Sequence, residues 1–590
     1  MTAEHAGPAR TVTRTVSRTE RAVNGVLLPG FEGVRVPDRL ADAARAGLAG
    51  VVYFARNTPD VATTATLSAA LHSISPDLLI AVDEEGGDVS RLEAATGSSL
   101  PGAAALGAYP GGGTVSLDAG RALGRLLAAT GIDLLLGPVL DVVSEPDNPV
   151  IGVRAFGTTP DGVARHGIAF ARGVRSAGVG VCGKHFPGHG ATTVDSHVGL
   201  PVVDEPLDVV RARDLLPFAR ALRPEGRDAG QSALDAVMTA HVLYPALGPA
   251  PASIEPAATR LLRELGHTGP IITDALDMGA LRQLTGSVGE AAVRAVEAGA
   301  DLLCLGLDPA LYTESYDALS RAVATGRLTV ERLEESGERR HRLVAALRDR
   351  RAAAGAATGV RAAQEALADL SALGAHIADA VVHVRGRLVP LAADAEPDVV
   401  DLRTRLDHAA GRTARHVQSA VAAAWPGARL SRGPSPGETG ETPGEGVAWE
   451  GAAELLLDES GLAVLIARIS RYGVSADLDR TGVKRGAEFP GGVPRGASRS
   501  EPLVVITREP VPGSAERARL ERLWAVRPDL VVVHTGLPGP VDDWFGTLSG
   551  GGPAVVVACG TGRANAAAAV ERLRGSVDRR DSEEQRSSEQ

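Results

Sequence analysis

Short apolar runs that end in polar residues or glycine recur between residues 26 and 305 of the chain. Eight of these runs are three to five residues long, and longer stretches between them, such as 61–73 and 160–177, repeat apolar positions with helical spacing. The short runs are typical of strands that are buried on both faces, and the longer stretches are typical of helices. The pattern predicts strands at 26–28, 51–54, 78–82, 133–136, 179–182, 236–239, 271–273 and 302–305.

Strands that alternate with helices predict an α/β fold, either a closed (β/α)8 TIM-like barrel or a doubly wound open sheet. Polar residues favour the barrel, because five of them stand just after predicted strands: Asp83, Asp141, Lys184, His241 and Asp274. The C-terminal ends of all barrel strands meet on one face, where barrel enzymes build their active sites. The sequence therefore predicts an active site on that face.

The chain divides into segments of different composition. We expect a disordered N-terminal extension (1–22), a catalytic barrel (23–350) and an alanine-rich helical linker (351–393). A smaller, sandwich-like C-terminal α/β domain (394–576) follows, with a mobile Pro/Gly/Glu-rich loop at 431–446, and a disordered charged tail ends the chain (577–590). Within the C-terminal domain, apolar runs predict strands at 462–467, 502–507, 530–534 and 554–558 and a helix at 564–573.

Composition narrows the class of partner. The net charge of −11 and the pI of about 5.8 disfavour nucleic acid and anionic membranes, which the summed field would repel. No apolar run reaches 18 residues, and the N-terminus lacks the apolar core of a signal peptide. The three cysteines are widely spaced in apolar surroundings, which suits free thiols in a reducing compartment. We expect a cytoplasmic protein with a small ligand, and the oligomeric state stays open.

The stretch VGVCGKHFPGHGATTVDSH (179–197) gathers Lys184, His185, His189, Asp195 and His197. A metal site is disfavoured, because the proline and glycine between the first two histidines prevent the helix that would align them. A purely structural loop is a second interpretation. In a third, the Asp195 carboxylate accepts a hydrogen bond from His197 and makes it a proton-transfer group. In a fourth, Lys184 and His185 bind substrate hydroxyls. The last two are compatible.

Three further stretches supply candidate partners. Asp274, in GPIITDALDMGAL, points toward the barrel mouth or caps a helix, whereas Asp277 is expected inside that helix and is the weaker nucleophile candidate. Asp83 and Arg91, in AVDEEGGDVSRL, either bind a polyol together or pair with each other. Arg154, in DNPVIGVRAFG, is either a site residue or an ordinary surface arginine.

These stretches resemble glycoside hydrolase family 3, in its β-N-acetylglucosaminidase branch. The most specific element is KHFPGHG followed by DSH, and AVDEEGG, NPVIGVRAFG, MTAHVLYP and ITDALDMGAL occur in the family's order. The likeness is good over 26–347 and loose after residue 394. The chain departs from the family's usual residues at Asp88, Ala191 and Gly248, which leaves loop geometry and substrate reach open.

The resemblance implies a retaining exo-β-N-acetylglucosaminidase that acts on terminal β-linked GlcNAc of muropeptides or chitooligosaccharides. Asp274 would be the nucleophile, and His197, held by Asp195, the general acid/base. A small carbohydrate would be the substrate, without a cofactor or metal. Its hydroxyls would be bound by Asp83, Arg91, Arg154, Lys184 and His185, with His241 nearby. The alternatives are an N-acetyl-β-glucosaminide phosphorylase, a β-glucosidase and a non-catalytic sugar-binding relative.

Overall fold

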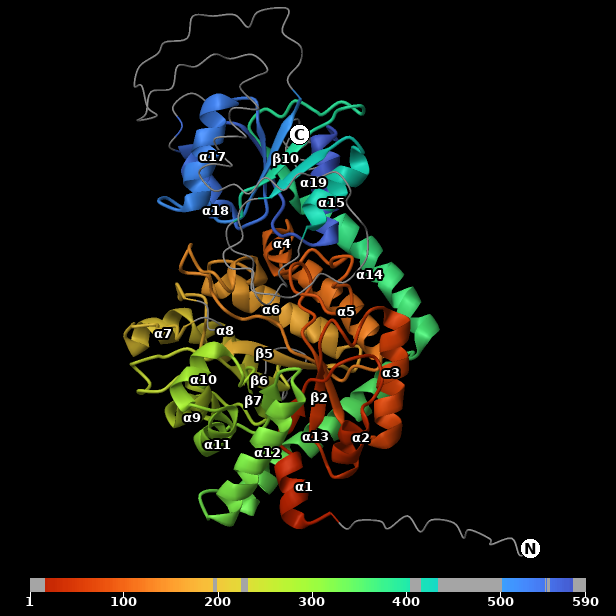
Figure 1. Ribbon diagram of the computed structural model, residues 1–590, viewed down its shortest axis with the longest axis vertical. Coiled ribbons are helices and arrows are strands. Elements are labelled where there is room, and N and C mark those ends of the chain that lie inside the picture. Colours follow the sequence, from red (N-terminus) through yellow and green to blue (C-terminus); the bar gives the residue numbers. More distant parts are fainter. Residues whose placement is uncertain are drawn as a thin grey trace, which may run out of the picture.

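The computed structural model of the chain describes residues 16–194, 199–223, 232–403, 415–432, 501–546, 548 and 552–576 (Figure 1). Its first part contains the eight predicted strands, with boundaries that differ by only a few residues. They are β1 (Leu27–Pro29), β2 (Gly50–Tyr53), β3 (Leu79–Val82), β4 (Leu134–Leu135), β5 (Gly180–Phe186), β6 (Ala236–Thr239), β7 (Ile271–Thr273) and β8 (Leu303–Leu305).

The strands follow one another around a ring in chain order, and all ladders are parallel. Strands β2 to β7 form one six-stranded sheet in sequence order, and β1 pairs with β8. The Thr273 amide donates to the Leu302 carbonyl and so joins β7 to β8, while the Ala49 amide donates to Asn24 where β1 meets β2. The ring confirms the (β/α)8 barrel and excludes the doubly wound sheet.

Helices connect successive strands and cover the outside of the ring. They are α2 (Asp38–Arg45), α3 (Val61–Ile74), α4 (Ala103–Ala108), α5 (Gly113–Ala129), α6 (Pro160–Arg175), α7 (Leu207–Arg213), α8 (Leu215–Leu222), α9 (Pro256–Glu264), α10 (Gly279–Thr285), α11 (Val288–Ala298) and α12 (Pro309–Ala324). Side-chain caps fix several starts, as where the Asp60 carboxylate accepts from the Thr63 amide before α3.

The inside of the ring is filled by small and branched side chains that alternate along the strands, among them Leu79 and Ala81 of β3. Helix α13 (Val330–Ala354) closes the N-terminal end of the ring, because its Leu343, Val344 and Leu347 join the same buried cluster. The barrel is therefore a packed core that α13 covers at its N-terminal end, and its C-terminal end is not covered by that helix.

The C-terminal domain holds a second six-stranded sheet, in the order β11-β10-β12-β13-β14-β9, with only β9 antiparallel to its neighbour. Successive residues of β12 point to opposite faces of the sheet, and Val504 and Val505 belong to different buried clusters. Both faces of the sheet are therefore covered. The strands are β9 (His383–Arg385), β10 (Asp398–Asp401), β11 (Arg429–Arg432), β12 (Leu503–Thr507), β13 (Val531–His534) and β14 (Ala554–Val557), and the helices are α15 (His416–Ala424), α17 (Ala515–Val526), α18 (Pro538–Gly546) and α19 (Arg563–Leu573).

Some predicted boundaries are wrong. Helix α1 (Arg18–Asn24) begins inside the predicted extension, because its Ala22 and Val23 pack into the core. The predicted linker holds the long helix α14 (Val360–Val381) but also β9, which completes the C-terminal sheet. Strand β11 includes residues 431 and 432 of the predicted loop, since it pairs with β10. The predicted strand at 462–467, residues 433–446 of that loop and the tail lie outside the described residues.

Candidate active site

Polar side chains from five consecutive strands occupy the C-terminal face of the barrel. Asp83 follows β3, Asp141 follows β4, and Lys184 lies near the end of β5. His241 and Asp274 follow β6 and β7. These are the strand-end positions that the sequence indicated, and the structure brings them to one face of one ring.

Lys184 lies at the centre of a buried ionic cluster. Its Nζ is 2.7 Å from Asp83 Oδ1 and 2.6 Å from Glu85 Oε1. Arg154 makes two hydrogen bonds to the same Glu85 carboxylate, at 2.8 and 2.9 Å. Burial would lower the pKa of Lys184, but Asp83 and Glu85 raise it above its usual value. Arg154 is therefore buried in this ionic cluster and is not a surface arginine.

Glu85 is a site residue that the sequence analysis missed. Burial would raise the pKa of its carboxyl, but Arg154 and Lys184 hold that pKa well below the usual range. The residue lies two positions after Asp83, so both side chains of this extended segment reach Lys184. Two buried cations, Lys184 and Arg154, need more than the single carboxylate of Asp83 to balance their charge. This requirement is a signal that could have identified Glu85.

Arg91 lies close to Asp83, but the two are not tightly paired, since the guanidinium is 3.8 Å from the nearer carboxylate oxygen. The buried Glu84 fixes the backbone here by accepting hydrogen bonds from the amides of Arg91 and Leu92, both at 2.8 Å. Burial raises the pKa of Glu84 to about 7, although these hydrogen bonds oppose the shift. Asp83 and Arg91 both keep partly exposed surfaces that a ligand can contact.

His185 is held by Asp141, a residue that the sequence placed at a strand end without assigning it to the site. The Asp141 carboxylate lies 2.7 Å from His185 Nδ1, and its other oxygen accepts from the His189 amide at 2.8 Å. Burial would raise the pKa of Asp141, but the neighbouring His185 ring lowers it. A carboxylate behind one ring nitrogen orients the imidazole toward the site.

His189 supports the loop and fits the structural interpretation of its stretch. Its Nδ1 is 2.8 Å from the Thr192 hydroxyl, and burial lowers the pKa of its ring to about 4. Asn148 donates to the His189 carbonyl, and the Tyr244 hydroxyl donates to the Gly188 carbonyl. The segment that leads from β5 toward residue 194 is thus fastened from two sides.

Asp274 does not cap a helix. Helix α10 begins only at Gly279, so neither Asp274 nor Asp277 caps it, and Asp277, expected inside the helix, precedes it. Burial would raise the pKa of the Asp274 carboxyl, but the rings of His185 and His241 and the Ala275 amide bring it to about 2. Asp274 is therefore an ionised, partly exposed carboxylate at the barrel mouth.

The neighbours of Asp274 have supporting contacts. His241 Nε2 donates to the Ala275 carbonyl at 2.9 Å, and its Nδ1 is 2.7 Å from the Ser253 hydroxyl, which fixes the ring beside the carboxylate. Asp277 accepts a hydrogen bond from the Gly306 amide at 2.9 Å, so it ties its loop to the end of β8. This contact gives Asp277 a structural partner three positions after Asp274.

Asp195 and His197 lie outside the described residues, so their pairing and their distance from Asp274 stay predictions. Within the described part of the chain, no group of three histidine, cysteine, aspartate or glutamate side chains is placed to hold a metal ion. The three cysteines are all buried free thiols.

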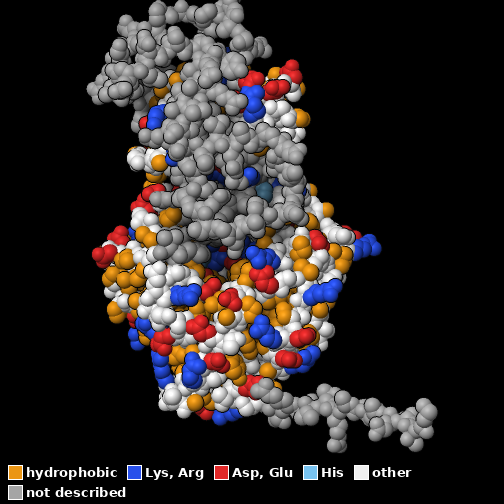
Figure 2. Space-filling model, in the orientation of Figure 1, with side chains coloured by type: hydrophobic (Ala, Val, Ile, Leu, Met, Phe, Trp, Pro, Cys, Tyr) orange, Lys and Arg blue, Asp and Glu red, His pale blue; other side chains and the backbone are white. Residues whose placement is uncertain are grey.

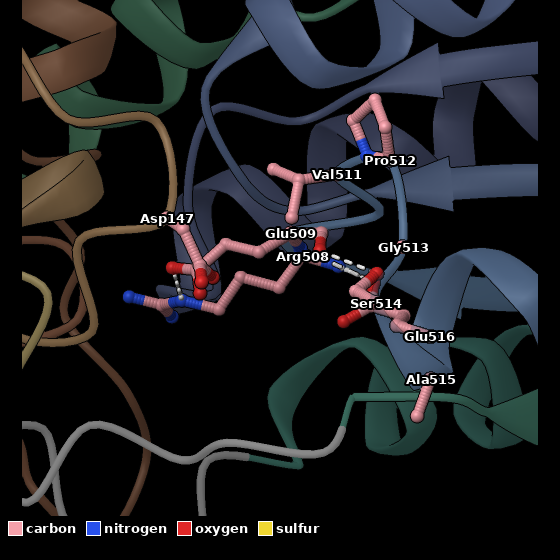
Figure 3. Close-up of a pocket in the computed structure, with 9 residues that line it drawn as sticks. All are labelled: Asp147, Arg508, Glu509, Val511, Pro512, Gly513, Ser514, Ala515 and Glu516. Carbon is pink, nitrogen blue, oxygen red and sulfur yellow. Dashed lines mark hydrogen bonds and ion pairs between the residues drawn. The ribbon is translucent and has the colours of Figure 1, made fainter.

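A cavity of about 390 Å³ lies where the C-terminal domain meets the loop after β4 (Figure 3). Asp147 of that loop faces Arg508 and Glu509, which follow β12, and the start of α17 completes the lining. The same loop continues into the short 3-10 helix Gly152–Arg154. The C-terminal domain therefore borders the segment that carries Arg154.

Comparison with known sequences identifies the family. The glycosyl hydrolase family 3 N-terminal domain matches residues 36–343, just over half of the chain. The chain belongs to glycosyl hydrolase family 3. The match spans the barrel and includes all five stretches on which the resemblance was based, so the family prediction is confirmed.

Curated relatives from this family are called beta-hexosaminidases. Beta-hexosaminidase A of Pseudoalteromonas piscicida is 35% identical over 332 residues, which are 51% of this chain and 54% of that protein. Beta-hexosaminidase of Pseudomonas aeruginosa (strain LESB58) is 38% identical over 293 residues, which are 49% of this chain and 84% of that protein. The chain thus spans about half the length of the first relative and most of the second.

A solved structure resembles the chain over almost its whole length. It is a glycoside hydrolase family 3 beta-N-acetylglucosaminidase from Paenibacillus sp. str. FPU-7, 28% identical, with a TM-score of 0.70, and the match covers 94% of this chain and 96% of that one. The likeness extends to the C-terminal domain, so the two-part architecture is shared.

Charged side chains are mixed on the part of the surface that Figure 2 shows. On the face shown in Figure 2, acidic and basic side chains are interspersed over the barrel rather than gathered by sign. No helix among the described residues is long and apolar enough to cross a bilayer.

Proposed function

We propose that the protein is a retaining exo-β-N-acetylglucosaminidase that hydrolyses terminal, non-reducing β-linked GlcNAc. One observation carries the proposal: Asp274, with a carboxyl pKa of about 2, stands at the same barrel mouth as the Lys184 cluster. The names of the relatives, beta-hexosaminidase and beta-N-acetylglucosaminidase, agree with a hexosamine substrate. Cell-wall muropeptides or chitooligosaccharides in the cytoplasm are the substrates that we expect.

The reaction runs in two displacements. Asp274 attacks the anomeric carbon and forms a covalent glycosyl-aspartate while the bond to the leaving-group oxygen breaks, and His197, supported by Asp195, protonates that oxygen. Water then attacks the same carbon as His197 takes a proton from it, which releases the sugar with its original anomeric configuration and frees Asp274. An imidazole, with an ordinary pKa near 6.5, exchanges protons in both directions near neutral pH.

The remaining site residues bind the sugar. Asp83 offers carboxylate oxygens to hydroxyl donors, while Arg91, Lys184 and His185 offer donors to hydroxyl oxygens. Because Lys184 and Arg154 are already fixed by Glu85, they meet the substrate without further ordering cost. This preorganisation explains why the site keeps so many buried charges.

The test is turnover of p-nitrophenyl β-GlcNAc and p-nitrophenyl β-glucoside, with and without inorganic phosphate, with NMR detection of the first sugar product. We expect GlcNAc in the β configuration, little release from the glucoside, and no need for phosphate. Faster release of GlcNAc-1-phosphate than of GlcNAc would replace the proposal with a phosphorylase. Preference for the glucoside would make the protein a β-glucosidase, and absence of all turnover would favour a sugar-binding relative.

A further inference from the structure

The loop after β3 makes contacts in two directions, and a tight turn separates them. Asp83 and Glu85 reach Lys184 on the side of the barrel mouth. A tight turn follows, in which the Glu85 amide donates to the Val89 carbonyl, and Gly86 has a φ of +83°, a conformation that suits glycine. Asp88 lies in this turn, three residues before Arg91, and points away from Lys184 toward the C-terminal domain.

Both oxygens of the Asp88 carboxylate are paired with residues of that domain. One oxygen accepts from the Thr561 amide at 2.7 Å and from the Thr561 hydroxyl at 2.9 Å. The other oxygen pairs with the Arg508 guanidinium, and the Asp88 side chain is only 1% exposed. A buried carboxylate keeps its charge only when such donors replace its water. The pKa of Asp88 supports this, because Arg508 and Thr561 lower it against the effect of burial.

Arg508 and Thr561 are themselves fixed within the C-terminal sheet. Arg508 follows β12 directly, and its backbone amide donates to the buried carboxyl of Glu516 in α17. Thr561 lies between β14 and α19, where a Cβ placed on the next residue, Gly562, would come within 3.2 Å of Gly87. The turn is therefore seated against rigid elements of the other domain.

We propose that Asp88 is a positioning residue through which the C-terminal domain holds the loop that presents Arg91 to the sugar. The domain thus acts on substrate binding without contacting the substrate. This assigns a purpose to one position where the chain departs from the usual arginine of its family. It also gives the C-terminal domain a role in the reaction.

The geometry supplies test variants and a matched control. Asp88→Asn and Arg508→Gln each remove one charge of the pair. Arg563→Gln removes a different ion pair across the same junction, between Arg563 and Glu93 at 2.6 Å. Glu93 follows Arg91 in the chain, and this pair does not involve the Asp88 carboxylate. All three variants weaken the contact between the domains, but only the first two act on the turn that precedes Arg91.

Two measurements are made on the full chain, and the first needs no ligand. Amide hydrogen exchange of Arg91 and Leu92 should accelerate about tenfold in Asp88→Asn and Arg508→Gln and stay at the wild-type rate in Arg563→Gln. Unchanged exchange in the first two variants would overturn the proposal. Equal acceleration in all three would also overturn it, because it would indicate general loosening of the junction. If Asp88→Asn does not fold, the exchange rates of Arg91 and Leu92 in Arg508→Gln alone test the proposal.

The second measurement rests on the proposed function and uses GlcNAc binding by calorimetry together with the KM and kcat for p-nitrophenyl β-GlcNAc. We expect Kd and KM to rise about tenfold in Asp88→Asn and Arg508→Gln, with a smaller change in kcat and no change in Arg563→Gln. Unchanged Kd in both variants would contradict the proposal. Failure of the wild type to bind GlcNAc would instead refute the substrate, and the exchange rates would still test the positioning.

Discussion

The two ends of the barrel use the same residue types for different purposes. At the N-terminal end, three aspartates stand one or two positions before β4, β6 or β8: Asp133, Asp235 and Asp301. Each accepts a hydrogen bond from the first or second amide of the preceding strand in its sheet. Each also pairs with an arginine of α13. These carboxylates close the barrel.

At the C-terminal end, the charges are arranged so that some surface stays accessible. Asp83, Arg91 and Asp274 are partly exposed, whereas Asp301 is completely buried and takes Arg263, Arg339 and Ser336 as partners. Carboxylates whose oxygens are all paired inside the protein, as at the N-terminal end, contribute to stability. Carboxylates with accessible surface, as at the C-terminal end, can contact a ligand. The contrast predicts that substitutions at the two ends affect different measured quantities.

The largest effect is expected at Asp274. Asp274→Asn removes the charge that attacks the anomeric carbon, so kcat should fall by roughly 10⁴- to 10⁶-fold, as when other enzymes lose a residue of their nucleophilic machinery. The unfolding midpoint should change little. Asp277→Asn is the control, because its amide oxygen still accepts from Gly306. Comparable losses in both variants would contradict the assignment of the nucleophile.

A smaller loss is expected at His197. His197→Ala removes the proposed proton donor and acceptor, so kcat should fall by about 10² to 10⁴-fold for an alkyl glycoside. A leaving group that departs without a proton, such as dinitrophenol, should recover part of the first step. The measurement is the ratio of the kcat for the dinitrophenyl glycoside to the kcat for the alkyl glycoside, in His197→Ala and in the wild type. Equal loss with both leaving groups would remove His197 from the role of acid.

The N-terminal end should respond in stability instead. Asp301→Asn leaves Arg263 and Arg339 with a neutral partner, which should lower the free energy of unfolding by about 3 kcal/mol, the lower end for broken buried ion pairs, because both arginines are partly exposed. Denaturant titration measures this change. The kcat of the folded protein should match the wild type. A loss of kcat without a loss of stability would break the distinction between the two ends.

The smallest effect concerns pH. The pKa of Glu84 is raised to about 7 by burial, so the folded state binds more protons than the unfolded state between pH 4.5 and 7. Stability should therefore fall as pH rises through this window, by about 2 kcal/mol from pH 5 to pH 7 for this group alone. Glu84→Gln should remove that part of the slope. A slope identical to the wild type would show that Glu84 does not titrate there.

The barrel was predictable because its strands are buried on both faces and appear as uninterrupted apolar runs. Strands β9, β10 and β11 were missed. Segments such as HVR and RLSR carry more polar than apolar residues, so they are recognisable as strands only from the strands with which they pair. The aspartates of the N-terminal end had a signal that could have been used, because GIDLL, ALDAV and GADLL each place Asp before a strand.

The site was predictable only where chemistry and strand ends coincide. Lys184, His185 and Asp274 follow that rule. Asp141 was predicted at a strand end, but its contact with His185 follows only from the fold, and Glu85 was missed because its two cationic partners come from other strands and loops. Asp88 was noted only as a departure from the family, because its meaning depends on Arg508, which lies 420 positions away in the chain.

The central claim is that Asp274 forms the covalent bond to the sugar. A fluorinated β-GlcNAc donor whose second displacement is slow should trap this intermediate, and mass spectrometry of the digested protein locates the added sugar. We predict one sugar on the peptide that contains Asp274, at the Asp274 carboxylate. A sugar attached to Asp277 or to any other residue would contradict the account.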